Sequence, residues 1–123
     1  MAKRILIVDD ELSVVELLRE GLSEAGFLVD GAYDAAEALV RVKDNLYDAA
    51  IVDFALPDMN GVMLHSKIRQ LDSDLGDCTL FISGQAQTDE SLIYYASEGT
   101  QFISKPFVLT DVIEAVRRVV HDA

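Results

Sequence analysis

Five polar side chains lie where apolar runs of the sequence end, and their types suit chemistry on a phosphoryl group. They are Asp9, Asp10, Asp53, Ser83 and Lys105. Asp9 and Asp10 follow directly on the apolar run ILIV, a place where adjacent carboxylates repel each other and cost desolvation energy. Two like charges about 4 Å apart repel by roughly 4 kcal/mol at an effective dielectric constant of about 20. Three carboxylates that share one cleft therefore require a cation.

Each of these side chains has a distinct use in such a cleft. Mg²⁺ is the natural cation, since it binds a few carboxylate oxygens together with waters and readily shares a phosphoryl oxygen. Lys105 adds a fixed positive charge, and the Ser83 hydroxyl can donate a hydrogen bond to an incoming oxygen. The set predicts a site for a phosphoryl group on or near a carboxylate, with the metal, the lysine and the hydroxyl each binding one equatorial oxygen.

The elements that must position these side chains follow from an alternation of short apolar runs and helical patterns. Strands are expected over residues 3–9, 27–33, 48–54, 78–83 and 101–104, and helices over residues 12–26, 35–45, 62–71, 88–99 and 111–122. This alternation predicts a (βα)₅ α/β fold, a doubly wound five-stranded parallel sheet of order 2-1-3-4-5 that is flavodoxin-like.

Ligands of such sheets bind outside the carboxyl ends of the strands, where the strand order reverses. We therefore expect the five polar side chains to converge there, and only the second strand, at an edge, offers none. Asp34 with Glu37 predicts a capping box for the second helix, and Thr110 a cap for the last helix. Gly26 is a stop signal for the first helix, whose apolar face begins at Leu12.

The composition is that of one globular domain over residues 1–123 with a strongly acidic balance. It includes 22 acidic and 10 basic side chains, for a formal net charge of −12. This balance argues against direct binding of nucleic acid, which needs clustered Lys and Arg. No apolar run approaches the roughly 20 residues that span a bilayer, and no signal peptide is recognisable. We expect a cytoplasmic protein without membrane contact.

Cysteine and histidine have ordinary interpretations in this sequence. The single Cys78 excludes an intramolecular disulfide and is expected to be a small buried apolar residue. His65 and His121 lie in helical patterns without the spacing of metal ligands, and both are expected at the surface.

Four motifs in this order, VDDE, VDFALPDMNG, FISG and FISKPF, resemble the receiver domain of two-component response regulators. The resemblance extends from Ile5 to the last helix, and the length is similar to that of the stand-alone chemotaxis-type regulator. It implies that Asp53 accepts a phosphoryl group from a histidine kinase. It also implies that Asp9 and Asp10, with Asp53 and the backbone carbonyl of Ala55, bind Mg²⁺.

The resemblance further implies a switch. Ser83 matches the hydroxyl that turns towards the phosphoryl group, Lys105 the lysine that pairs with it, and Phe102 the aromatic residue that changes rotamer in step. The bond between Lys105 and Pro106 matches a peptide bond that is cis in the family. Residues 88–99, 101–104 and the last helix match the surface that meets partners, here called the output face. Of Tyr94 and Tyr95, one is expected to pack and the other to face solvent, either as part of this surface or as an exposed residue only.

The partners implied are a sensor histidine kinase or phosphotransfer protein, and an output domain or effector that binds the output face; a homodimer on that face is also compatible. The domain would catalyse only its own phosphorylation and slow dephosphorylation, with Ala55 and Gln85 at the positions that tune the lifetime. Phe102 is common at its position in the family, but a tyrosine there would add a hydroxyl that could bond a partner. With phenylalanine, the inward and outward states must differ by packing alone. Gly84 replaces the usual alanine, which loosens the loop after Ser83.

Two other classes of protein share parts of this pattern. A phosphohydrolase of haloacid dehalogenase type would place a second aspartate two residues after the nucleophile, where this chain has Ala55. A flavin-binding electron carrier would need a phosphate loop rich in Gly, Ser and Thr after the first strand, where the acidic stretch DDE would repel phosphate. Both fit the sequence less well than a signalling module, whose output domain or effector the sequence does not identify.

Overall fold

The computed structural model of the protein describes residues 2–84 and 101–120. Its five strands form one continuous parallel sheet. The strands are β1 (Arg4–Val8), β2 (Leu28–Ala32), β3 (Ala49–Asp53), β4 (Thr79–Ser83) and β5 (Gln101–Ser104), in the order β2-β1-β3-β4-β5. Every neighbouring pair is parallel. The helices described are α1 (Leu12–Glu24), α2 (Ala35–Asp44), α3 (Gly61–Leu71), α4 (Ser73–Asp77) and α6 (Leu109–Val120). The predicted fold class is confirmed.

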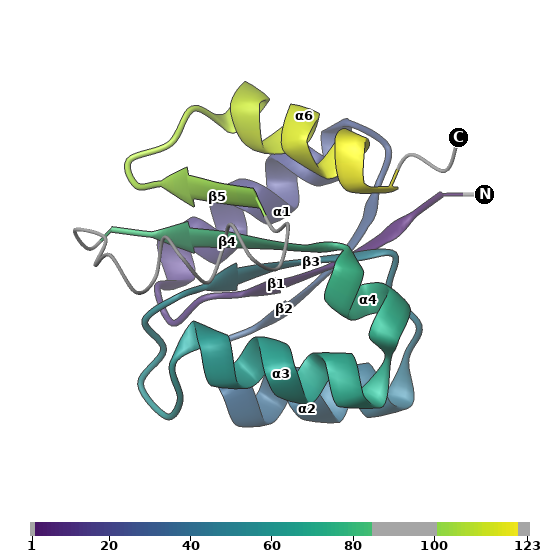
Figure 1. Cartoon of the computed structure of the whole chain (residues 1–123). Helices are drawn as coiled ribbons and strands as arrows, with labels where there is room; N and C mark the ends of the chain where they lie inside the picture. Colours follow the sequence, from purple (N-terminus) through teal and green to yellow (C-terminus); the bar gives the residue numbers. More distant parts are fainter. Residues whose placement is uncertain (1, 85–100, 121–123) are drawn as a thin grey trace.

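Helices cover both faces of the sheet, with α1 and α6 on one side and α2, α3 and α4 on the other (Figure 1). Alternate residues of each strand feed the two cores, as the pleat of a strand requires. In β1, for example, Ile5 and Ile7 pack with α1 and α6, whereas Leu6 and Val8 pack with α2 and α3. Because both faces are covered, β1, β3 and β4 consist almost entirely of buried residues.

The switch point of strand order lies between β1 and β3, as predicted. Val8 pairs with Ala32 on one side and with Val52 on the other. Asp53, the last residue of β3, pairs with Ile82, so that Ser83 follows it by one position on β4. The carboxyl ends of three strands thus form one edge that carries acidic and hydroxyl side chains.

The short helix α4 was not predicted, and its presence makes the prediction for His65 wrong. Asp72 caps α4 through a hydrogen bond from the amide of Leu75 (3.1 Å), and α4 folds back onto α3. This covers His65, whose exposed fraction is 0%, and places its Nε2 2.7 Å from the carbonyl oxygen of Gly76. A carbonyl only accepts, so a hydrogen bond here requires the proton on Nε2, a nitrogen that also lies 3.4 Å from Arg69 Nη2. His65 is a bonded core residue.

Predictions about helix ends had mixed outcomes. The cap at Asp34 is confirmed, because its Oδ1 accepts a hydrogen bond from the amide of Glu37 (2.8 Å). Gly26 follows α1 with φ of +101°, a conformation that favours glycine, so the stop signal is confirmed. The cap at Thr110 is wrong: α6 begins at Leu109, and the amide of Asp111 bonds to the carbonyl of Val108 (2.9 Å).

Two apolar residues are less buried than predicted. Leu12 begins α1 with 55% of its surface exposed. Cys78 is half-buried, and its Sγ donates to the carbonyl of Val119 (3.4 Å). The helix expected over residues 88–99, with Tyr94 and Tyr95, lies outside the described residues, as do Gln85 and His121. Among the residues described, no helix is long and apolar enough to span a membrane.

Candidate functional site

The three aspartates of the sequence prediction converge at the carboxyl edge of the sheet. One carboxylate oxygen from each of Asp9, Asp10 and Asp53 can be chosen so that all three lie within 4.8 Å of one another. Asp9 has an exposed fraction of 0% and Asp53 of 5%, whereas Asp10 is exposed. Two of the three charges are therefore held in a poorly solvated position, where repulsion between them is strongest.

Lys105 enters this cluster from the loop after β5 and contacts three carboxylates. Its Nζ lies 2.9 Å from Asp9 Oδ2, 2.7 Å from Glu11 Oε1 and 3.4 Å from Asp53 Oδ2. Burial of the ammonium group acts to lower the pKa of Lys105, but the carboxylates of Glu11, Asp9 and Asp53 outweigh it and raise this pKa above its usual value. Lys105 is a permanent cation of the cluster.

Asp53 is in the opposite situation, since its environment disfavours the charged form. Burial raises the pKa of Asp53 and the nearby charge of Asp9 raises it further. The hydrogen bond from the amide of Ala55 (3.1 Å) and the charge of Lys105 lower this pKa, but the net shift is upward. Asp53 therefore holds its proton more tightly than an exposed aspartate does.

The donor set fits a hard divalent cation such as Mg²⁺. It consists of carboxylate oxygens, which this ion prefers, and the exposed Asp10 leaves room for coordinated waters. Asp9 Oδ1 accepts from the amide of Glu11 (2.8 Å), but the buried Asp9 Oδ2 accepts no hydrogen bond from the described residues and has only the ion pair with Lys105. A buried carboxylate oxygen in this state is well suited to bind a cation.

Ala55 lies in the connection between β3 and α3, which is closed at both ends. The amide of Phe54 bonds to the carbonyl of Ile82 (2.9 Å), and the amide of Gly61 bonds to the carbonyl of Phe54 (2.7 Å). Ala55 and Asn60 form an antiparallel bridge across the connection. A β-carbon at Gly61 would lie 2.8 Å from Cα of Phe54, so this close approach requires glycine. The bridge between Ala55 and Asn60 fixes the path of the connection as it continues from Asp53.

Ser83 and Phe102, the two residues of the predicted switch, lie on the neighbouring strands β4 and β5. Ser83 ends β4 with an exposed fraction of 1%, and its carbonyl accepts from the amide of Lys105 (2.8 Å). Phe102 is half-buried on β5, pairs in register with Phe81 and packs against the core under α2 and α3. The Lys105–Pro106 bond is cis, as the family resemblance implied.

Three contributions to the site were not foreseen from the sequence. Glu11 approaches Lys105 more closely than Asp53 does, and Asp58 binds the start of α2. The second strand was expected to offer nothing, but the carbonyl of Ala32 at its end accepts from the amide of Asp9 (3.1 Å). Glu11 directly follows Asp9 and Asp10 in the sequence, yet spacing alone does not show which carboxylate reaches the lysine.

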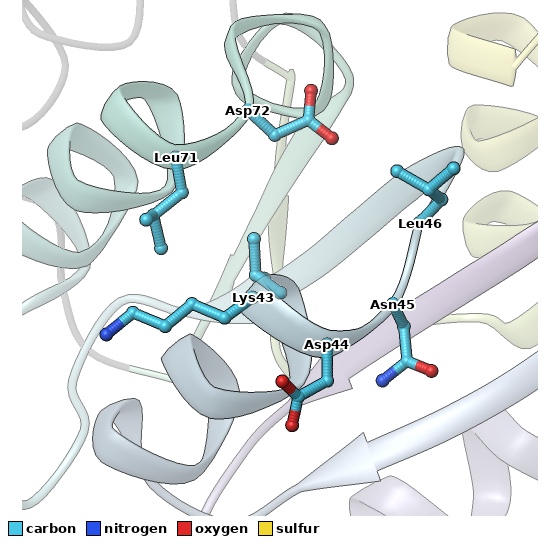
Figure 2. Close-up of a pocket in the computed structure, with 7 residues that line it drawn as sticks. Lys43, Asp44, Asn45, Leu46, Leu71 and Asp72 are labelled. Atoms are coloured by element: carbon cyan, nitrogen blue, oxygen red, sulfur yellow. The ribbon is translucent and has the colours of Figure 1, made fainter.

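Two surface cavities lie away from this cluster, near the amino ends of the strands. One, of about 370 Å³, lies where α2 and α3 end, between Lys43, Leu46 and Leu71 (Figure 2). The second, of about 480 Å³, includes Leu46, Tyr47 and Cys78. Neither is lined by a residue of the acidic cluster.

Comparison with known proteins identifies the family. Residues 5–117 match the family described as "Response regulator receiver domain". The transcriptional regulatory protein PrrA of Mycobacterium tuberculosis is 33% identical over 114 residues, which cover 93% of this chain and 48% of that protein. The chain thus spans about half the length of the curated relatives it matches first.

Solved structures agree with this result. A CheY-like receiver domain protein from Methanospirillum hungatei has a TM-score of 0.88 at 28% identity, covering 98% of this chain and 94% of that one. The non-phosphorylated HemR receiver domain from Leptospira biflexa has a TM-score of 0.86 at 32% identity, covering 98% and 96%. With its acidic cluster at the switch point of the sheet, the chain belongs to the response regulator receiver domain family.

Proposed function

We propose that this domain is a phosphorylation-controlled signalling module that accepts a phosphoryl group on Asp53 in a Mg²⁺-dependent reaction. The observation that carries the proposal is the position of Asp53: it is buried, its pKa is raised, and it lies among Asp9, Asp10 and Lys105. A buried carboxylate beside two further carboxylates and one lysine has too much negative charge for a structural role alone. The Asp53 carboxylate is suited to act as a nucleophile whose negative charge is balanced by a metal ion.

The transfer would proceed by attack of an Asp53 carboxylate oxygen on the phosphorus of a donor. The new O–P bond forms as the bond from phosphorus to the donor's leaving atom breaks, and the leaving atom keeps the electron pair. Mg²⁺, when bound by Asp9, Asp10, Asp53 and the Ala55 carbonyl, would supply positive charge to a phosphoryl oxygen. Lys105, already 3.4 Å from Asp53 Oδ2, would bind a second oxygen, and the Ser83 hydroxyl a third.

The same geometry supports a regulatory readout. To reach a phosphoryl oxygen the Ser83 side chain must turn towards Asp53, which vacates space behind β4. Phe102 lies beside that space on β5 and can fill it, because Phe81 and Phe102 are paired residues of the two strands. The movement would change the output face, including β5 and α6. Asp53 phosphorylation thus has a route to a partner through packing.

The proposed phosphodonor is a sensor histidine kinase or phosphotransfer protein, and the proposed receiver of the signal is an output domain or effector on the output face. Exposed apolar side chains support the first of these, since Leu12 directly follows Glu11 in the chain and Val108 lies three residues after Lys105. The relatives called transcriptional regulatory proteins are about twice as long as this chain, which supports an output domain for the second.

We further propose that the domain turns over no separate metabolite. Ala55 stands two residues after Asp53, so no carboxylic acid is placed there to protonate an external leaving group. The phosphoryl group would leave by slow hydrolysis from Asp53 itself. The domain thus catalyses only its own phosphorylation and dephosphorylation.

Labelling with acetyl phosphate tests the proposal. With Mg²⁺ present, mass spectrometry should show one added phosphoryl group that is stable in acid and labile in base, on Asp53. Asp53→Asn should show none, and chelation of Mg²⁺ should abolish labelling of the parent. Asp48→Asn removes an exposed carboxylate at the other end of β3 and should be labelled as the parent is. Stoichiometric labelling of Asp53→Asn would refute the assignment.

A further inference from the structure

One side chain, that of Asp58, joins the connection between β3 and α3 to the first turn of α2. The amide of Ala35 donates to Asp58 Oδ1 and the amide of Ala36 to Oδ2, both at 3.0 Å. These amides are among the N-terminal donors that a helix leaves without an internal partner. The bonds also hold the pKa of Asp58 below its usual value. Asp58 is thus a tertiary clamp between two elements.

Asp58 is not needed to begin α2, because Asp34 does that locally. The Asp34 side chain accepts from the amide of Glu37 (2.8 Å), and its carbonyl accepts from the amide of Ala38 (3.1 Å). The element that gains most from the clamp is therefore the connection over residues 54–60. Its two ends are closed by the bridge between Ala55 and Asn60, but the bridge does not fix how the connection lies relative to β1 and β2.

The segment that Asp58 binds also holds the other side of the acidic cluster. The carbonyl of Ala32, which directly precedes this segment, accepts from the amide of Asp9 (3.1 Å). Residues 32–36 therefore bind Asp9 at one end and Asp58 at the other. Asp9 belongs to one half of the cluster, and the connection that carries Ala55 follows directly on Asp53 in the other half.

We propose that Asp58 is a positioning residue for the metal site: through Ala35 and Ala36 it sets the position of Ala55 and Asp53 relative to Asp9. The proposal rests on the proposed function of the site. Ligands held in place before the ion arrives bind it more tightly, because less order has to be created on binding. Asp58 itself contacts no ligand atom of the ion; its effect passes through the backbone of α2.

The test compares Asp58→Ala with Asp34→Ala. Each removes one negative charge and one N-terminal partner of α2, so both should reduce stability and change the net charge alike. Mg²⁺ binding is measured by NMR from the amide shifts of Asp10 and Ala55 during a titration. We expect Asp58→Ala to bind Mg²⁺ about tenfold more weakly than the parent, the scale of effect that residues supporting metal ligands have. Asp34→Ala should stay within about twofold of the parent, because the Asp34 side chain bonds within α2, to the amide of Glu37.

A second variant, Ala36→Pro, keeps all charges and removes the amide that donates to Asp58 Oδ2. The proline ring also restricts the backbone of Ala35, the other donor to Asp58. Proline is tolerated in the first turn of a helix, and Ala36 is exposed. This variant should also weaken Mg²⁺ binding, and it keeps the test decisive if Asp58→Ala does not fold. Labelling by acetyl phosphate should slow in both variants and recover at saturating Mg²⁺.

The outcomes separate two failures. If the parent neither binds Mg²⁺ nor is labelled on Asp53, the proposed function is wrong. If the parent does both, while Asp58→Ala binds Mg²⁺ as Asp34→Ala does, or Ala36→Pro binds it as the parent does, the positioning role of Asp58 is wrong and the proposed function stands.

Discussion

Asp53 is costly to the fold, and in the proposed function it is the residue that accepts the phosphoryl group. Burial and the charge of Asp9 raise its pKa, so the folded protein holds the Asp53 proton more tightly than the unfolded chain does. The contribution of such a group to stability is full below its unfolded pKa and is lost as the pH rises through its folded pKa. At neutral pH, the ionised Asp53 therefore destabilises the protein without metal.

The first prediction at this scale follows from that sign. Asp53→Asn, which replaces the charge by a neutral group of the same shape, should raise the melting temperature at neutral pH without Mg²⁺. The gain over the parent should shrink as the pH is lowered, because the parent's Asp53 then becomes neutral as well. Mg²⁺ should stabilise the parent by mass action and lose most of this effect in the variant. Melting temperatures measured over pH, with and without Mg²⁺, check this; equal stability of the two proteins at neutral pH would contradict it.

Most residues of the site were predictable because strand ends are predictable. A parallel sheet brings its carboxyl ends to one edge, so Asp9, Asp53 and Ser83 had to lie close together once their runs were recognised as strands. Glu11 and Asp58 were not predicted. Each acts from a connection between elements, and the reach of such a side chain depends on how those elements dock.

At the scale of elements, the strands and long helices were predicted and the short helix α4 was not. Its five residues, SDLGD, hold one apolar side chain, so they give no helical period to detect. Yet Leu75 is buried, and α4 encloses His65 against Phe81, with ring centroids 5.3 Å apart and nearly perpendicular planes. The prediction that His65 lies at the surface was wrong because no pattern in the sequence indicates α4, the helix that covers it. Exposure of a helical residue depends on neighbours that its own periodicity does not reveal.

Two glycines in the connections next to the site, Gly84 and Gly61, lead to opposite predictions for substitution by alanine. At Gly84 an added β-carbon would lie 3.6 Å from the Lys105 side chain, an ordinary contact. Gly84→Ala should therefore stabilise the protein by about 0.4–1 kcal/mol, by reducing the freedom of the unfolded chain. At Gly61 the β-carbon would lie 2.8 Å from the Cα of Phe54. Gly61→Ala should destabilise by about 1–3 kcal/mol, as overpacking does. Urea unfolding of both variants measures this, and the same sign of change in the two would show that the connections are wrongly described.

At the scale of the whole molecule, the proposed route from the site to the output face runs through the sheet. Asp53 on β3 lies beside Ser83 on β4, and Ser83 pairs with Ser104 on β5. β5 is in turn tied to α6 by a hydrogen bond from Arg118 to Gln101 (3.1 Å). A phosphoryl group adds about 1.5 to 2 negative charges beside Lys105. Two states that differ by about 1 to 3 kcal/mol then suffice for a large change in population.

The most direct test of this account is the response of the output face to an anion on Asp53. Beryllofluoride, a phosphoryl mimic, is added with Mg²⁺ to the parent and to Ser83→Ala, and amide NMR shifts are followed in β5 and α6. We expect the parent to show clear shifts around Phe102 and Gln101. In Ser83→Ala, the mimic should still shift residues next to Asp53, but the shifts in β5 and α6 should largely disappear. Equal shifts of β5 and α6 in both proteins would contradict the account.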